Sequence, residues 1–79
     1  MTDRLYIYAA IDAERERQDQ KHGDRSIASP QVGMETAYLI LAEEVGEVAR
    51  ALLEEGSLTD LHQELVQVAA CAVGWLEAL

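Results

Sequence analysis

The chain has a single proline, Pro30, and helix-forming residues fill the long stretches on either side of it. Because proline breaks a helix or marks its end, the two proline-free stretches are free to be helical. The alternation of apolar and polar residues that is typical of strands, flanked by turn residues, is absent from the sequence. The sequence therefore predicts an all-α protein, and its 79 residues suffice for one small domain over 1–79.

Capping and turn residues divide the chain into three predicted helices. The first is expected to run from Thr2, as the N-cap, to about residue 21, with Gly23 ending it. The second begins between residues 29 and 34 and ends at residue 55, before Gly56, and the third follows Ser57 as its N-cap and reaches the last residue. The connection over 22–33 is longer than most links between helices, and such loops often carry function.

Charge and apolar length exclude several classes of protein. Fifteen acidic residues against six Lys and Arg give a net charge of −9, which would repel the phosphates of a nucleic-acid polymer. The most apolar stretch, residues 65–79, is too short to cross a bilayer, which needs about 20 residues. No signal-peptide pattern opens the chain, and the lone Cys71 excludes an intrachain disulfide. We therefore expect a cytoplasmic protein with no membrane partner.

Three glutamates fall where a helical wheel predicts apolar side chains. Glu44 lies at the margin of the apolar stripe of the second helix, with Glu47 one turn further on. Glu64 lies among the apolar positions of the third helix, and Gln67 is one turn along from it. Buried like charges need protons or cations, and oxygen ligands in this arrangement suit Mg²⁺ or Mn²⁺. Alternatively, these glutamates pair with Arg50, Arg15 or Lys21, or face solvent.

The first helix contributes a stripe that begins apolar, with Ile7 and Ile11, and turns polar toward Gln18 and Lys21. This stripe is expected to form a side wall of the same acidic cavity. Gln18 can hydrogen-bond a base or a phosphate, and Lys21 can neutralise phosphate charge. The alternative for Lys21 is an ordinary solvated helix end.

The segment from Glu43 to Glu47, EEVGE, followed after 16 residues by the segment from Glu64 to Gln67, ELVQ, resembles the paired motif of MazG-like nucleoside triphosphate pyrophosphohydrolases. The first motif matches fully, whereas Gln67 stands where that family has an aspartate. The segment over 14–23 also resembles a short N-terminal signature of MazG-like proteins, in which the position of His22 is often tryptophan. The resemblance covers most of the chain.

The resemblance implies an all-α, Mg²⁺-dependent enzyme, with Mn²⁺ as a second metal, that hydrolyses (deoxy)nucleoside triphosphates between the α and β phosphates. Position by position, it implies metal ligation by Glu44, Glu47, Glu64 and Gln67. Glu43 would be a further ligand or the base that activates water, so that Glu43 and Glu44 are the catalytic carboxylates. His22 would stack on the base or remain a solvated loop residue, beside Gln18 and Lys21 as substrate-binding residues.

The third helix is apolar almost all round over 65–79, more than two other short helices can cover. We therefore expect a homodimer or homotetramer in which the three helices of each chain complete four-helix-bundle packing. Gln67 keeps a second function open, in which the chain is a catalytically weak or inactive oligomerisation or nucleotide-binding module of the same family.

Overall fold

The computed structural model describes residues 2–79, which form three α-helices and one short 3-10 turn. The helices are α1 (Arg4–His22), α2 (Met34–Leu53) and α3 (Leu58–Ala78), and the turn η1 (Gly23–Arg25) follows α1 directly. Residues 2–79 contain no strand. The all-α prediction is therefore confirmed.

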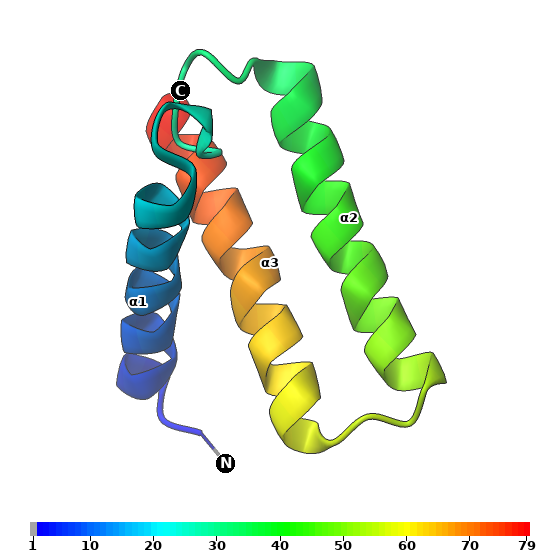
Figure 1. The fold of residues 1–79 in the computed structure, drawn as a ribbon. Helices are drawn as coiled ribbons and strands as arrows, with labels where there is room; N and C mark the ends of the chain where they lie inside the picture. Colours follow the sequence, from blue (N-terminus) through cyan, green and yellow to red (C-terminus); the bar gives the residue numbers. More distant parts are fainter. Residues whose placement is uncertain (1) are drawn as a thin grey trace.

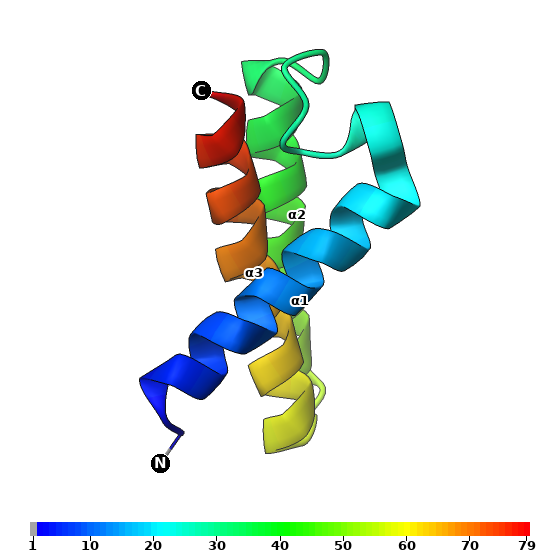
Figure 2. The same cartoon turned by 90° about the vertical axis from the view of Figure 1, so that its left-hand side faces the viewer.

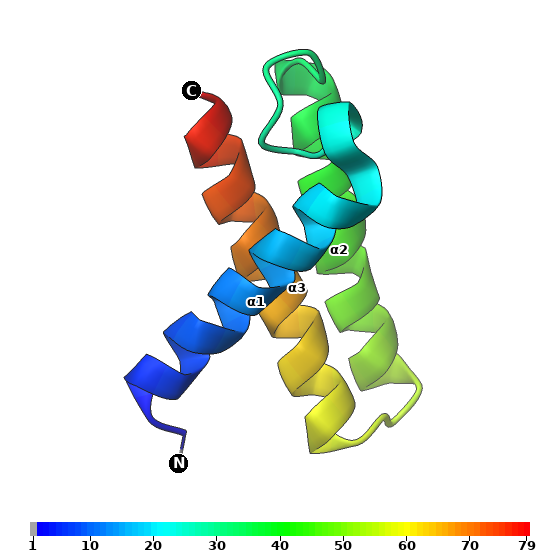
Figure 3. The same ribbon diagram turned by 60° about the vertical axis from the view of Figure 1, so that its left-hand side comes forward.

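The helices α2 and α3 form an antiparallel hairpin, and α3 lies between α2 and α1 (Figure 1). The helix α1 crosses α3 obliquely, as Figures 2 and 3 show from two further directions. Both outer helices pack against α3, whereas the backbones of α1 and α2 do not approach each other within the described residues. The helix α3 thus connects α1 and α2, which do not pack against each other in the described part of the chain.

The predicted helix limits are correct within a few residues, but three details differ from the prediction. Asp3, not Thr2, caps α1, because its side chain accepts a hydrogen bond from Leu5 N. The second helix begins at Met34 and ends two residues before position 55, since Glu55 has left-handed backbone angles with φ 55°. The connection over 22–33 is not loop throughout, because its first part forms η1.

The start of α3 follows the predicted capping chemistry. Ser57 Oγ accepts a hydrogen bond from Asp60 N at 3.0 Å, and Asp60 Oδ2 accepts one from Ser57 N at 3.2 Å. This reciprocal capping box satisfies two backbone donors that a helix start leaves free. Asp60 therefore has a structural role at the first turn of α3.

The core is small and includes one residue from the connection between α1 and α2. Ile27 forms one buried cluster with Ala37 of α2 and Cys71 of α3, and Trp75 packs against this cluster. Gly74 makes the insertion of Ile27 possible, because a Cβ at Gly74 would lie 2.5 Å from Ile27 Cγ2. The connection is therefore packed onto α3 instead of lying free on the surface.

Much apolar surface stays exposed on this single chain. The accessible surface is 5851 Å², whereas a folded monomer of this mass exposes about 4700 Å². The exposed side chains include Tyr38, Val45 and Leu52 of α2 and Leu58 and Leu65 of α3. Within each helix these residues follow one another at intervals of seven positions and so share one face. None of the described helices has the length and apolarity needed to span a membrane.

Candidate functional site

A pocket of about 480 Å³ opens between α1 and α2 above α3. It brings together six of the residues predicted from the sequence, namely Gln18, Lys21, His22, Glu43, Glu44 and Gln67. These residues come from three different helices, so the pocket exists only in the folded chain. Cys71 of α3 also contributes to its wall.

Glu44 and Glu64 each have one buried carboxylate oxygen, Oε2, without a hydrogen-bond partner within the described residues. Burial raises the pKa of Glu44, and the charges of Glu64, Glu43, Glu47 and Glu14, in that order, raise it further. A buried carboxylate oxygen without a partner is costly, and most buried polar atoms in folded proteins are satisfied. Binding of a proton or a cation would therefore stabilise these two oxygens.

Glu47 behaves differently from Glu44. Its Oε2 lies 3.7 Å from Arg50 Nη1, in a pair that is partly exposed to solvent. Glu47 does not line the pocket, and neither does Glu64. Glu47 thus has a nearby cation in Arg50, whereas Glu44 and Glu64 each keep an oxygen without a partner among residues 2–79, and metal ligation by all three stays a prediction.

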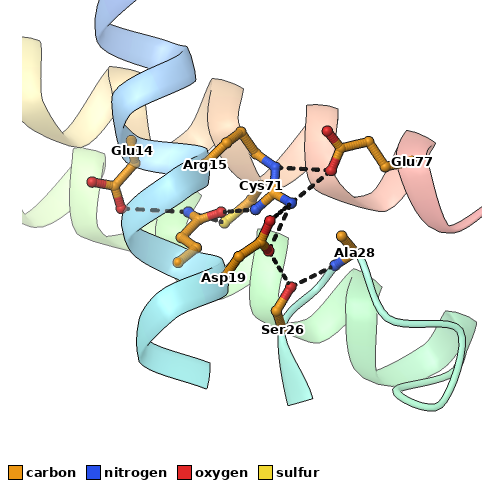
Figure 4. Close-up of polar contacts among 8 residues, drawn as sticks. Glu14, Arg15, Asp19, Ser26, Ala28, Cys71 and Glu77 are labelled. Carbon is orange, nitrogen blue, oxygen red and sulfur yellow. Dashed lines mark hydrogen bonds and ion pairs between the residues drawn. The ribbon is translucent and has the colours of Figure 1, made fainter. Parts of the chain in front are cut away.

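Arg15, a candidate partner of these glutamates in the sequence, makes its bonds to other residues. Its guanidinium donates hydrogen bonds to Glu77 Oε2, to both oxygens of Asp19 and to Gln18 Oε1 (Figure 4). Arg15 is 5% exposed, and these bonds satisfy most of its donors. Arg15 therefore does not line the pocket, and its polar network contacts the pocket wall through Gln18.

Glu14, which also lines the pocket, is neutralised by its neighbour on α1. Arg17 donates hydrogen bonds to Glu14 Oε1 at 2.9 Å and to Oε2 at 2.6 Å. The hydrogen bond from Arg17 is the main reason that the pKa of Glu14 lies below its usual value. The charge of Glu44 adds slightly to the raised pKa of Arg17, which places this cation within electrostatic reach of the unpartnered acid.

Gln18 is buried, and its amide is already engaged. Its Oε1 accepts a hydrogen bond from Arg15 at 2.8 Å, while Nε2 donates longer bonds to Glu14 and to Cys71 Sγ at 3.7 Å. A ligand that reaches Gln18 therefore competes most easily for Nε2. The role of Gln18 in substrate binding stays a prediction.

Cys71 is a free thiol buried at the base of the pocket. Burial, with a smaller contribution from the charge of Glu44, raises its pKa to about 11. A thiol with so high a pKa is almost entirely protonated near neutral pH and is a poor nucleophile. Cys71 therefore has a packing role.

The pocket residues that the sequence analysis missed include Arg17, Arg25, Ile27 and Ile40. The spacing of Arg17 from Glu14 on one helix face was a signal for their pairing. No sequence signal pointed to Arg25 or Ile27, because their positions depend on how η1 folds the chain back over α3.

The residues present fit a divalent cation in part. Among residues 2–79, no three His, Cys, Asp or Glu side chains gather in a group that could hold a metal ion. Mg²⁺, however, commonly binds through one or two carboxylates and completes its shell with water and substrate phosphates. The unpartnered oxygens of Glu44 and Glu64 match that smaller requirement.

Comparison of the chain with protein-family profiles, curated proteins and solved structures finds no match.

Proposed function

We propose that this protein is a metal-dependent nucleotide pyrophosphohydrolase that cleaves (deoxy)nucleoside triphosphates between the α and β phosphates. The observation that carries the proposal is the pair of buried, unpartnered oxygens of Glu44 and Glu64, beside a pocket that also holds cationic side chains. The resemblance of the acidic motifs to MazG-like enzymes points in the same direction. A cytoplasmic location fits this proposal, because nucleoside triphosphates are abundant there.

In the proposed reaction, Glu44, Glu47 and Glu64 would hold Mg²⁺ or Mn²⁺, with Gln67 as a neutral oxygen ligand. When bound, the metal offsets the charge of the leaving pyrophosphate and lowers the pKa of the attacking water. Glu43, on the exposed side of the pocket, accepts the proton of that water. The water oxygen forms a bond to the α phosphorus, and the bond from that phosphorus to the bridging oxygen breaks.

The cationic side of the pocket suits the substrate. Lys21 neutralises phosphate charge, and His22 presents a ring on which the base can stack. Gln18 Nε2 is the donor available for the base or sugar. Without a metal, the acids would repel a triphosphate, so activity is expected to depend strictly on a divalent cation.

The test measures pyrophosphate release from a panel of nucleoside and deoxynucleoside triphosphates with Mg²⁺ or Mn²⁺. Glu44→Gln and Glu64→Gln should each lower kcat by at least about 100-fold, because each removes a charged ligand worth several kcal/mol in the transition state. Glu54→Gln, an exposed change at the end of α2, is the matched control and should keep activity. No release from any triphosphate by the folded wild type would refute the enzymatic proposal.

We also propose that the chain acts as a homodimer or homotetramer with four-helix-bundle packing. The exposed surface exceeds that of an average monomer of this mass by about 1100 Å², and a stable interface buries roughly 800 Å² on each partner. Sedimentation or light scattering at micromolar concentration should therefore give a mass of at least twice 8.7 kDa. A monomer under these conditions would contradict this assembly.

A second candidate function is a helical oligomerisation or nucleotide-binding module without turnover. Gln67 favours it, because an amide brings no charge to a metal site. The exposed apolar faces of α2 and α3 would serve such a module equally well. Metal-dependent stabilisation by a nucleotide without product formation would favour the nucleotide-binding module over the enzyme.

A further inference from the structure

The turn η1 places one cationic side chain, Arg25, at the pocket. Gly23 ends α1 with φ 53°, a left-handed conformation that suits glycine, and its N–H donates to Asp19 O. Ser26 N then donates to Gly23 O at 3.0 Å and closes the turn. The path of the backbone at Arg25 is therefore defined on both sides.

A chain of polar contacts fixes this turn to the rest of the protein (Figure 4). Ser26 is 2% exposed, and its Oγ donates to Asp19 Oδ1 at 2.7 Å and accepts from Ala28 N at 3.1 Å. Asp19 in turn accepts from Arg15, and Arg15 donates to Glu77 of α3 at 2.6 Å. The residue next to Arg25 is thus held by contacts that extend through α1 to α3.

The pocket collects cations in a strongly acidic chain. Three of the six Lys and Arg residues line it, and of these Arg17 is paired with Glu14. Lys21 and Arg25 form no ion pair with any acid between residues 2 and 79. Two free positive charges thus share one pocket with the unpartnered carboxylate of Glu44. A pocket with both an unpartnered carboxylate and free cations suits a polyphosphate that binds together with a metal ion.

We infer that Arg25, together with Lys21, binds the β and γ phosphates of the substrate, and that Ser26 and Asp19 are positioning residues for Arg25. This inference rests on the proposed function and assigns a residue to the phosphate tail. A guanidinium presents several donors in one plane and binds phosphate oxygens in pairs, which Lys21 alone cannot do. The ligand chemistry is a linear polyphosphate, either free or carried by a nucleoside.

The test measures binding of inorganic tripolyphosphate with Mg²⁺ by calorimetry, at constant ionic strength, to the full chain. Arg25→Gln should weaken binding at least about 10-fold, because a charge-assisted hydrogen-bond pair is lost. The matched control, Arg4→Gln, removes the same charge from an exposed position outside the pocket and should change affinity less than 2-fold, about the effect of net charge alone. Equal effects of the two variants, or no binding by the wild type, would overturn the inference.

The positioning residues are tested with Ser26→Ala and Asp19→Asn, after circular dichroism has verified that each variant is folded. Each should weaken tripolyphosphate binding about 3-fold, and neither should weaken it further once Arg25→Gln is present. A further loss in the double variants would show that Ser26 and Asp19 act independently of Arg25 and would overturn their assignment as positioning residues.

The ligand series separates the two sources of the phosphate chain. Arg25→Gln should weaken the binding of a nucleoside triphosphate as much as that of tripolyphosphate, and it should leave the affinity for the nucleoside monophosphate unchanged. Weaker binding of the monophosphate would contradict the assignment of Arg25 to the β and γ phosphates.

Turnover separates the inference from the proposed function. If the wild type releases pyrophosphate and Arg25→Gln leaves KM unchanged, the inference fails and the function stands. If the wild type has no turnover but binds tripolyphosphate through Arg25, the function fails and the phosphate site stands.

Discussion

Two buried polar groups lie against α3, and they differ in how completely their atoms are satisfied. In the first, Arg15 donates to Asp19 and Glu77, and Ser26 completes the chain of hydrogen bonds. In the second, Glu44 and Glu64 each keep a buried oxygen without a partner. The first group holds the connection between α1 and α2 in place, whereas the second is an electrostatic imbalance that folding alone does not relieve. The comparison thus distinguishes polar residues that stabilise the fold from polar residues that are available to bind a ligand.

The largest expected effect that sharpens this contrast is stabilisation by a divalent cation. At a Mg²⁺ concentration about 100-fold above Kd, the wild type should gain about 2.7 kcal/mol, since the ion binds the folded state. Glu44→Gln should lose this gain, whereas Arg15→Ala should keep it. Thermal unfolding with and without Mg²⁺, at one protomer concentration, measures the difference. Equal stabilisation of wild type and Glu44→Gln would remove the distinction between the two groups.

Removal of Arg15 should be the next largest effect. Arg15→Ala deletes a buried guanidinium with bonds to two acids and should lower the free energy of unfolding by about 2 kcal/mol. This effect is smaller than the roughly 3–5 kcal/mol that breaking a buried ion pair costs, because Asp19 and Glu77 are half exposed and can be solvated again. Chemical denaturation of metal-free protein measures it, with the exposed Arg4→Ala as control. A loss no larger than that of the control would show that the network is dispensable.

A pair of glycine substitutions tests how closely the first group is packed. A Cβ at Gly74 would lie 3.0 Å from Arg15 Cζ and still closer to Ile27, whereas a Cβ at Gly46 of α2 meets nothing within 4 Å. Gly46→Ala should stabilise by up to about 1 kcal/mol through helix propensity. Gly74→Ala should destabilise by about 1 kcal/mol, because crowding exceeds the same gain. Thermal unfolding measures both effects. If Gly74→Ala stabilised the protein as Gly46→Ala does, Ile27 and Arg15 would have to move aside at little cost.

The smallest effect concerns pH, and the two groups should respond in opposite directions. Burial and neighbouring acids raise the pKa of Glu44 above 4.5, so the folded state binds more protons than the unfolded state just above that pH. The destabilisation that the buried, charged carboxylate of Glu44 causes therefore decreases as the pH falls through its folded pKa. The hydrogen bond from Ser26 is the largest cause that lowers the pKa of Asp19 below 3.8, so its contribution holds above that value and is lost below it.

The measurement is the melting temperature of metal-free wild type, Glu44→Gln and Asp19→Asn from pH 7 to pH 3. Any advantage of Glu44→Gln over wild type should decrease toward pH 4.5. Any deficit of Asp19→Asn should persist to about pH 4 and disappear only below pH 3.8. Parallel curves for the three proteins would contradict both assignments.

Most of the fold was predictable because its signals are local. Glycine and serine near the helix ends, together with the spacing of apolar residues, predicted three helices in the right places. Ser57 caps α3 as expected, and the structure adds a reciprocal bond from Asp60. Asp3 took the capping role expected of Thr2, since its carboxylate accepts from Leu5 N. The position of Glu44 in an apolar margin was also a local signal, and its buried oxygen agrees with it.

The partners of the polar residues could not be predicted in the same way. The sequence offered both Arg50 and Arg15 as partners for the glutamates, and Arg50 does pair with Glu47. Arg15, however, reaches Glu77, 62 positions away. Such a contact depends on the angle at which α1 crosses α3, and no local pattern encodes that angle.

The sequence by itself determined an all-α chain, its helix limits, its acidic charge and which glutamates oppose the apolar pattern, because all of these depend on neighbours within a few turns. Only the tertiary structure decided which acids are neutralised and which are not. It also decided that η1 brings Arg25 to the pocket and that Ile27 fits against Gly74. The physical reason is that burial and electrostatic pairing depend on distances in space between residues that are far apart in the chain.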